Sequence, residues 1–310
     1  MKKTYHFLML LTLSLLLYAC ENSENEITID VLVPNGTTAV SHALIEHGHD
    51  SIAVERVSGT NLLISAFTSE SHDIIIAPIN LGANLYNKGA DYQLLGVLTW
   101  SNLQFISNEP IESVHDLIGK DIHAFGKGAI PEMIVDSLLT ETDLIDDVNI
   151  NYHSQSAQES YTHFMQNGGI ALTAQPVTTI ANNNVEDLYI LNVEDLWHQF
   201  MGNEGFPQAG IFVKSTLTND QIELYSNALT EGINQTYTKP NLIANYCESM
   251  DYPFPKAIIE QTIPYSGIDY VHIDQAKQVV LTFMDQILEF NPDLINDKLP
   301  EDHFYYSTNE

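Results

Sequence analysis

Short apolar runs alternate with amphipathic stretches along most of the chain, and this pattern predicts an α/β protein. Two runs, Ile74–Ala77 and Leu94–Leu98, are short and uniformly apolar, as expected of strands buried on both faces. Residues 27–98 follow the order strand, helix, strand, helix, strand, which favours a largely parallel sheet flanked by helices. The same rhythm restarts near residue 113, and the chain is predicted to be helical from Asn219 onward. The pattern therefore predicts two α/β lobes, with the final helices packed against one of them.

The periodicities also assign the individual elements. Strands are predicted at 27–33, 51–57, 74–77, 94–98, 121–125, 148–153, 170–173, 188–193 and 208–213, with an extended segment at 105–107. Helices are predicted at about 39–47, 62–69, 113–118, 157–166, 220–237, 240–250, 255–261 and 274–290, with two more ending near 139 and 182.

The first twenty residues are typical of an export signal rather than of a folded domain. Lys2 and Lys3 precede an apolar segment, Phe7–Leu17, that is too short to span a bilayer comfortably. The segment closes on Leu17-Tyr18-Ala19-Cys20, which resembles a bacterial lipoprotein signal with acylation at Cys20. We expect residues 21–26 to form a tether, and the chain to be extracytoplasmic and lipid-anchored. An uncleaved anchor and an ordinary secretory signal are the alternatives.

Acidic residues dominate the charge of the chain. It holds 41 Asp and Glu against 11 Lys and Arg, and without Lys2 and Lys3 the count of 9 cations leaves a formal charge of −32. This balance excludes nucleic-acid binding, and anionic membrane surfaces should repel the body of the protein. With Cys20 assigned to lipid, Cys247 has no disulfide partner and is expected in the core. We expect a monomer.

Polar turns follow several predicted strands and are expected to meet at one cleft, because ligands of open α/β sheets bind at the carboxyl ends of strands. Amides at helix N-termini, hydroxyls and side-chain amides there could hold a polar or anionic group. Ordinary helix capping is the alternative for several of them. The candidates from these turns are Asn35, Gly36, Thr37, Thr38, Asn80, Leu81, Gly126, Lys127, Gly128 and Gln175.

Trp100 and Asn102 form a further candidate pair at the end of the second apolar run. A tryptophan beside a cleft can stack on a planar ligand, and a core or hinge tryptophan is the alternative. The turn Gly126–Gly128 lacks the GK[ST] signature of a phosphate loop, so a nest of backbone amides for a small anionic or polar group fits better.

Five segments together resemble a known family. They are DIIIAPINLG at 73–82, LLGVLTWSN at 94–102, DLIGKDIHAFGKGAIP at 116–131, the Gln175-Pro176 turn, and FPQAGIFVK at 206–214. In this order and spacing the chain is similar to the substrate-binding lipoproteins of ABC importers of the nitrate/sulfonate/taurine type, a family that also includes binders of a thiamine pyrimidine precursor. The resemblance covers nearly the whole chain after the signal.

This resemblance implies a class II periplasmic-binding-protein fold, with two lobes joined by two crossing strands and a small molecule bound between them. The crossings would lie near Leu103–Ser107 and Gly210–Lys214. Lobe one would be 27–106 plus 214–310, and lobe two 107–213. The implied partner is an ABC permease, and no cofactor is implied.

Two departures from the family bear on the ligand. Gln175 stands where the family often carries Glu before proline, and the single arginine, Arg56, lies on a predicted strand. Lys127 is then the one cation at a candidate cleft loop, which argues against a doubly charged anion. A sulfonate-like oxyanion and a planar heterocycle both remain open as ligands.

Metal binding and catalysis find little support in the sequence. His42, His47 and His49 form a local cluster that could suggest zinc, but a solvated helix end explains it as well. His123 and His153 lie on predicted strands and are interpreted as packing residues. No nucleophile or metalloprotease motif occurs. An enzyme on the same fold and a surface interaction lipoprotein are the alternatives to a solute receptor.

Overall fold

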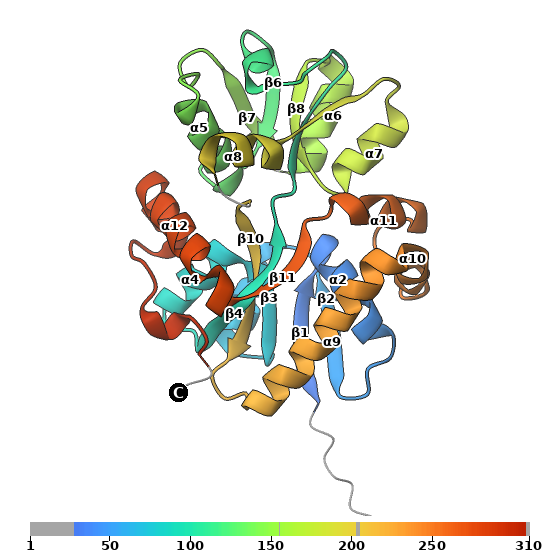
Figure 1. Cartoon of the computed structure of the whole chain (residues 1–310), viewed down its shortest axis with the longest axis vertical. Helices are drawn as coiled ribbons and strands as arrows, with labels where there is room; N and C mark the ends of the chain where they lie inside the picture. Colours follow the sequence, from blue (N-terminus) through green and yellow to red (C-terminus); the bar gives the residue numbers. More distant parts are fainter. Residues whose placement is uncertain (1–27, 155, 203–204, 308–310) are drawn as a thin grey trace, which may run out of the picture.

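The chain folds into two lobes, each built on one β-sheet flanked by helices (Figure 1). A computed structural model describes residues 28–154, 156–202 and 205–307. The larger sheet has the strand order β11-β4-β10-β3-β1-β2 and the smaller sheet the order β7-β6-β8-β5-β9. In the larger sheet β1 to β4 run in one direction, since β1 is parallel to β2 and β3 and β10 opposes both β3 and β4. In the smaller sheet β5 opposes the other strands. The predicted two-lobed α/β architecture is confirmed.

The larger lobe contains both ends of the described chain. Its strands are β1 (Ile29–Pro34), β2 (Ile52–Val57), β3 (Ile74–Pro78), β4 (Tyr92–Trp100), β10 (Pro207–Lys214) and β11 (Ile268–His272). Its helices are α2 (Thr37–Gly48), α3 (Thr60–Ser69), α4 (Ile79–Asn87), α9 (Asn219–Thr238), α10 (Pro240–Ser249), α11 (Lys256–Thr262) and α12 (Ile273–Phe290), with short 3₁₀ turns η2 (Ile263–Tyr265), η3 (Pro292–Ile295) and η4 (Asp302–Phe304).

The smaller lobe is formed by the middle of the chain. Its strands are β5 (Leu103–Ser107), β6 (Ile122–Phe125), β7 (Ile150–Ser154), β8 (Ile170–Ala174) and β9 (Tyr189–Asn192). Its helices are η1 (Val114–Leu117), α5 (Ile130–Glu141), α6 (Ala157–Asn167), α7 (Val177–Asn184) and α8 (Val193–Met201).

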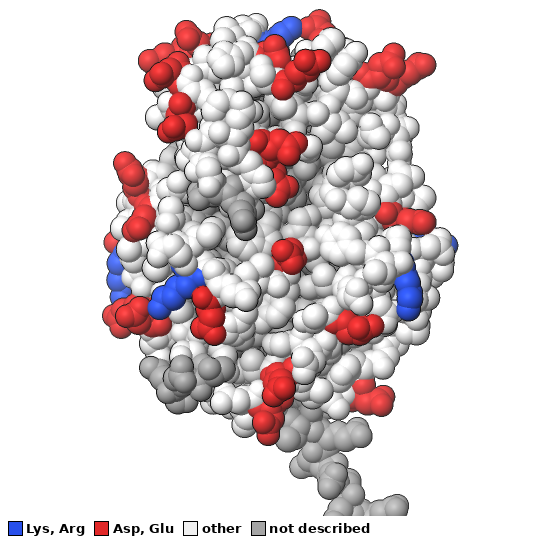
Figure 2. Space-filling model, in the orientation of Figure 1, with Lys and Arg blue, Asp and Glu red and all other residues white. Residues whose placement is uncertain are grey.

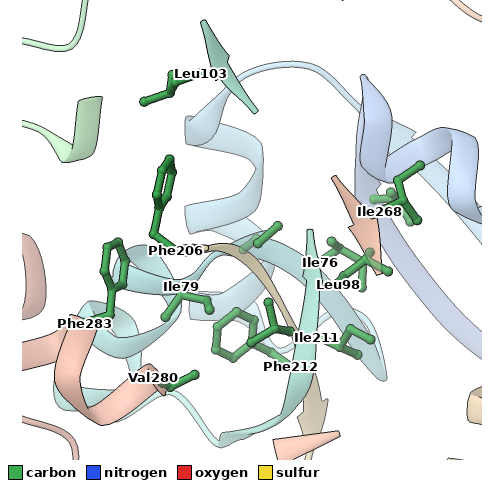
Figure 3. Close-up of a cluster of buried hydrophobic side chains, with 14 of the residues drawn as sticks. Ile76, Ile79, Leu98, Leu103, Phe206, Ile211, Phe212, Ile268, Val280 and Phe283 are labelled. Atoms are coloured by element: carbon green, nitrogen blue, oxygen red, sulfur yellow. The ribbon is translucent and has the colours of Figure 1, made fainter. Parts of the chain in front are cut away.

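The apolar strands β3, β4 and β10 form the centre of the larger core (Figure 3). Ile76, Leu98 and Phe212 are fully buried there, and burying such a side chain contributes about 1.5–3 kcal/mol. Gly82 of α4 lies against the ring of Phe212, where an added Cβ would come within 2.0 Å of a ring carbon. The missing side chain at Gly82 is therefore what lets α4 pack directly on β10.

The two chain crossings lie a few residues away from their expected positions. β4 ends at Trp100 in the larger sheet and β5 begins at Leu103 in the smaller one, so the first crossing is Ser101-Asn102. The chain returns between Met201 and Pro207. The expected crossing segments Leu103–Ser107 and Gly210–Lys214 instead lie within the paired strands β5 and β10. Their buried, apolar character reflects sheet pairing inside a lobe rather than a hinge between lobes.

Three elements were not predicted. The segment Pro78-Ile79-Asn80-Leu81-Gly82, expected as a turn, begins helix α4 immediately after β3. Helix α8 begins at Val193, directly after β9, whereas the sequence pattern predicts a strand up to residue 193 and no helix after it. Strand β11 pairs antiparallel with β4 inside a region expected to be helical. That pairing joins segments about 170 residues apart, so local periodicity does not reveal it.

The N-terminal features lie outside the described residues: the signal at 1–20, Cys20 and the tether at 21–26. None of the described helices is both long and apolar enough to cross a membrane. Acidic side chains are scattered over both lobes on the face shown in Figure 2. Cys247 is fully buried, and burial raises the pKa of its thiol to about 12, which confirms it as a core residue.

Candidate functional site

A cavity of about 370 Å³ lies between the lobes, where the carboxyl ends of several strands meet. The loops after β1, β2, β3 and β4 contribute from the larger lobe, and those after β6 and β8 from the smaller lobe. The lining is polar on one side, with Thr37, Thr38, Thr60, Asn80 and Thr99. It is apolar on the other, with Phe125, Ile130, Pro131 and Ala174. The first crossing adds Asn102, β10 adds Gln208, and α12 adds Phe283.

Four helices begin at this cavity. The residues preceding them are Gly36 for α2, Gly59 for α3, Pro78 for α4 and Ala129 for α5, and none of the four provides a side-chain cap. Away from the cavity, Ser156, Thr218 and His272 cap α6, α9 and α12, whereas α7, α8, α10 and α11 also begin without a side-chain cap. An uncapped helix start leaves backbone N–H groups available and carries a partial positive charge. The cavity therefore offers donors for an anionic or strongly polar group.

The cavity itself has no charged wall. None of the described residues that line it is ionisable. A doubly charged anion would enter without a cation to balance it, and burying unpaired charge is costly. Helix N-termini and hydroxyls suit a singly charged or neutral polar group better.

Buried hydrogen bonds behind the polar wall hold the start of α2 in place. The hydroxyl of Thr38 donates to the Pro34 carbonyl at 2.8 Å. Nδ1 of His42 is 3.0 Å from the Thr38 carbonyl oxygen. Because a carbonyl can only accept a hydrogen bond, Nδ1 is the protonated ring nitrogen and donates to it. Nε2 of His42 then accepts from the Tyr225 hydroxyl at 2.9 Å. Burial lowers the pKa of His42 to about 4, which keeps the ring neutral at neutral pH.

Four of the predicted site residues line the cavity. Thr37 and Thr38 lie at the start of α2, Asn80 in the first turn of α4, and Asn102 at the first crossing. No side-chain hydrogen bond to another described residue engages the Asn80 amide, which leaves it available to a ligand. The strand-end argument thus located the polar wall.

Three neighbouring candidates lie beside the cavity rather than on it. Asn35 donates its side-chain amide to Ser58 Oγ at 2.8 Å, which ties together the loops after β1 and β2. Gly36 has φ of +126°, a conformation that favours glycine, and lines a small apolar hollow with Phe254. Leu81 packs against the hydrophobic core.

Trp100 lies on the opposite side of β4 from the cavity. Its indole N–H donates to the Asp269 carbonyl at 2.9 Å, and its ring lines a separate hollow with Glu194 and Tyr265. Successive side chains of a strand point to opposite faces, so the cavity receives Thr99 instead. Trp100 thus contacts β11 and does not line this cavity, and its ligand-stacking role stays a prediction.

The glycine-rich turn of the smaller lobe is occupied by one of the chain's own carboxylates. One oxygen of Glu132 accepts from the Gly128 N–H at 2.6 Å, and the other accepts from Lys127. This bond raises the pKa of Lys127, whose side chain is 70% exposed. None of Gly126, Lys127 and Gly128 lines the cavity. In this turn Glu132 accepts from the Gly128 N–H and the Lys127 ammonium, which are two of the donors predicted for a ligand.

Gln175 faces another hollow, which is lined by residues of both lobes. Its side-chain oxygen accepts from Thr179 Oγ1 at 2.8 Å, and it shares the hollow with Gln261 and Tyr265. Its neighbour Ala174 reaches the cavity in its place.

The histidine cluster suggested by the sequence is dispersed. His42 is buried in the network described above, His47 stacks on Tyr246 at 3.7 Å between ring centroids, and His49 accepts from the Ser51 N–H at 3.2 Å. Among the described residues, no three histidine, cysteine, aspartate or glutamate side chains are arranged as a ready metal site.

Several lining residues escaped the sequence analysis. Thr60 follows β2 at a strand end, so the argument that selected Thr37 and Asn80 could also have selected it. Phe283 comes from α12, about 200 residues away in sequence from the strands that it faces, and no local pattern indicates its position.

The fold is shared with solved binding proteins, although no family model and no curated protein matches the chain. An ABC transporter structure from Parabacteroides distasonis is 22% identical, with a TM-score of 0.80 over 91% of this chain and 100% of that chain. The periplasmic aliphatic sulphonate binding protein SsuA from Escherichia coli is 15% identical, with a TM-score of 0.65 over 92% and 95% of the two chains.

A third structure, the alkanesulfonate-binding protein SsuA from Xanthomonas axonopodis pv. citri bound to MOPS, is 15% identical. Its TM-score is 0.59 over 84% of this chain and 93% of that chain. At these identities the likeness shows a shared fold. It confirms the class II periplasmic-binding-protein architecture that the sequence resemblance implied.

Proposed function

We propose that this chain is the solute-binding lipoprotein of an ABC importer. It would be exported, anchored outside the cytoplasm through lipid on Cys20, and would deliver a small organic molecule to a permease. The observation that carries this proposal is the cavity of about 370 Å³ between two lobes, lined by strand-end loops from both. Neighbours of the same fold are described as sulphonate-binding and ABC transporter proteins, which supports the same class of function.

The lining favours a ligand with two chemically different ends. Its polar end would meet the uncapped starts of α2, α3 and α4 together with Asn80 and the threonine hydroxyls. Its apolar end would contact Phe125, Ile130 and Phe283. An organic monoanion of the sulfonate type satisfies both ends, and a planar neutral heterocycle satisfies the apolar end with weaker use of the helix starts.

Capture would follow from closure of the lobes around the ligand, which requires only that both walls contact it in the closed state. Two hydrogen bonds join the lobes in this structure. Asn291 after α12 donates to the Gly128 carbonyl at 2.7 Å, and Asn183 of α7 donates to Gln261 Oε1 at 2.7 Å. These contacts would add to the stability of the closed form.

An enzyme on this fold is the weaker alternative. Proton transfer in catalysis normally needs an ionisable side chain near the reacting group, and none of the described lining residues is ionisable. The cavity is better suited to holding a molecule than to transforming it.

The test is a thermal-shift panel on the purified protein. We expect alkyl and aryl sulfonates to raise Tm, because a ligand that binds only the folded form stabilises it by mass action. Matched neutral sulfonamides and dianionic phosphonates should shift Tm less. If none of these compounds, nitrate or pyrimidines shifts Tm, the solute-receptor proposal fails. Separately, Cys20→Ser should move the protein from the membrane fraction to the soluble fraction.

A further inference from the structure

Three histidines from separate segments meet on the smaller lobe, away from the cavity. His123 lies on β6, His153 on the neighbouring edge strand β7, and His163 on α6, which packs over β6. The ring centroids are 5.4 Å apart for His123 and His153, 5.7 Å for His123 and His163, and 4.2 Å for His153 and His163. None of the three lines the cavity between the lobes.

His123 is the most buried of the three histidines, and its ring nitrogens make no hydrogen bond to the described residues. It is 5% exposed. Buried polar atoms normally have such partners, and one that lacks them requires an explanation. His42 in the larger lobe shows the usual situation, since both of its ring nitrogens are hydrogen-bonded.

A carboxylate lies at the edge of the same group. Oδ2 of Asp121 is 3.9 Å from Nε2 of His123, and Oδ1 of Asp121 accepts from the side-chain amide of Asn151 at 2.9 Å. The parallel register pairs His123 with Asn151. Asp121 therefore lies on the same side of β6 as His123, because side chains two residues apart on a strand point the same way. The pairing of β6 with β7 shifts register at His153, and it is the ring contact with His123 that places His153 beside this group.

We propose that His123, His153 and His163 bind a divalent transition metal, with Asp121 as an oxygen ligand. Zinc fits this set best, since three imidazoles and one carboxylate match its preference for tetrahedral nitrogen and oxygen ligands. Imidazoles bound to one tetrahedral zinc at about 2.0–2.1 Å have ring centroids roughly 5 Å apart, which matches the spacing of the three rings. Asn151 orients Asp121, as outer-shell partners of metal ligands commonly do.

The three rings contact one another in this structure, and as they stand they are not arranged as a metal site. Strand register and helix packing set the backbone positions, so the change needed is rotation of side chains. His153 is exposed and His163 is partly exposed, so both have room to turn. The bound metal would connect the edge strand β7 to β6 and α6, which would stabilise the smaller lobe.

The test uses the full chain, purified without a histidine tag and titrated with Zn²⁺ and with Co²⁺ as a spectroscopic probe. We expect one equivalent to bind, with visible absorption bands of tetrahedral Co²⁺ and a rise in Tm. The variant His153→Ala/His163→Ala should weaken Zn²⁺ binding at least tenfold. The control His47→Ala/His49→Ala, which removes two histidines of the larger lobe, should bind as the wild type does.

Absence of stoichiometric binding, or equal binding by both double variants, would overturn the proposal. Far-ultraviolet circular dichroism checks that the variants fold, and the single change His163→Gln provides a milder version of the same test. The thermal shift caused by an organic ligand of the cavity should be the same in all variants, so this outcome is independent of the proposed transport function.

Discussion

The two walls of the cavity differ in chemistry although both are built from strand ends. The larger lobe presents Thr37, Thr60, Asn80 and uncapped helix starts beside apolar Leu63 and Phe283. The smaller lobe presents apolar residues such as Phe125 and Ile130. The smaller lobe also has an anion-binding turn, but Glu132 satisfies it internally. A strand end followed by a helix can therefore bind a ligand only where no side chain of the protein occupies the backbone N–H donors of the turn.

This difference suggests an order of events. The polar end of a ligand would be held first by the larger lobe, because the free donors are there. The smaller lobe would then close its apolar wall over the ligand and exclude water, which strengthens the polar contacts already made. The following experiments alter one wall at a time, from the largest expected effect to the smallest.

Acidification should destabilise the larger lobe through His42, which supports the polar wall. Its pKa is about 4 in the folded protein against 6.5 for an ordinary histidine, so the unfolded chain takes up the proton at higher pH. The free energy of unfolding should therefore fall as the pH decreases from 6.5 to about 4, by on the order of 3 kcal/mol from this group.

Urea unfolding of the wild type and of His42→Gln at pH 7 and 4.5 measures this effect. The variant should lose less stability on acidification, while the exposed control His47→Gln should follow the wild type. Equal pH dependence of wild type and His42→Gln would mean that another group is responsible.

Asn80→Ala should weaken ligand binding at least tenfold, because the side chain is part of the polar wall and has no competing side-chain bond. Tenfold corresponds to about 1.4 kcal/mol, within the range for a hydrogen bond to a charged group. Isothermal titration with the ligand found in the thermal-shift panel measures it. Unchanged affinity would place the polar end of the ligand elsewhere.

Phe125→Ala should weaken binding severalfold by removing apolar contact from the smaller lobe. Trp100→Ala is the matched control, since this ring faces the other side of β4. In the same titration, the folded Trp100→Ala protein should bind with a Kd within about twofold of the wild type. A larger loss for Trp100→Ala than for Phe125→Ala would reverse the assignment of the two faces.

Lys127→Met should have the smallest effect on affinity. The ammonium group is exposed and bonded to Glu132 rather than directed into the cavity, so the Kd for a monoanionic ligand should change by less than about twofold. A strong loss in the same titration would show that the lysine reaches the ligand after closure.

The sequence alone located part of the polar side of the cavity and none of its apolar side. Thr37, Thr38, Asn80 and Asn102 were found because they follow apolar strands, and strand ends of a parallel sheet meet at one edge. The same rule selected Lys127 and Gly128, which do not line the cavity, because the rule does not show that a carboxylate four or five residues later occupies the turn.

By itself the sequence determined the fold class, the two-lobed order and the sheet edge at which the cavity lies. These follow from hydrophobic periodicity and from the order of strands and helices, which are local properties of the chain. Only the tertiary structure decided that Thr99 rather than Trp100 faces the cavity, that Phe283 lines it, and that His123, His153 and His163 meet. Each of these depends on strand register or on packing between distant segments, and neither is encoded in any single stretch of residues.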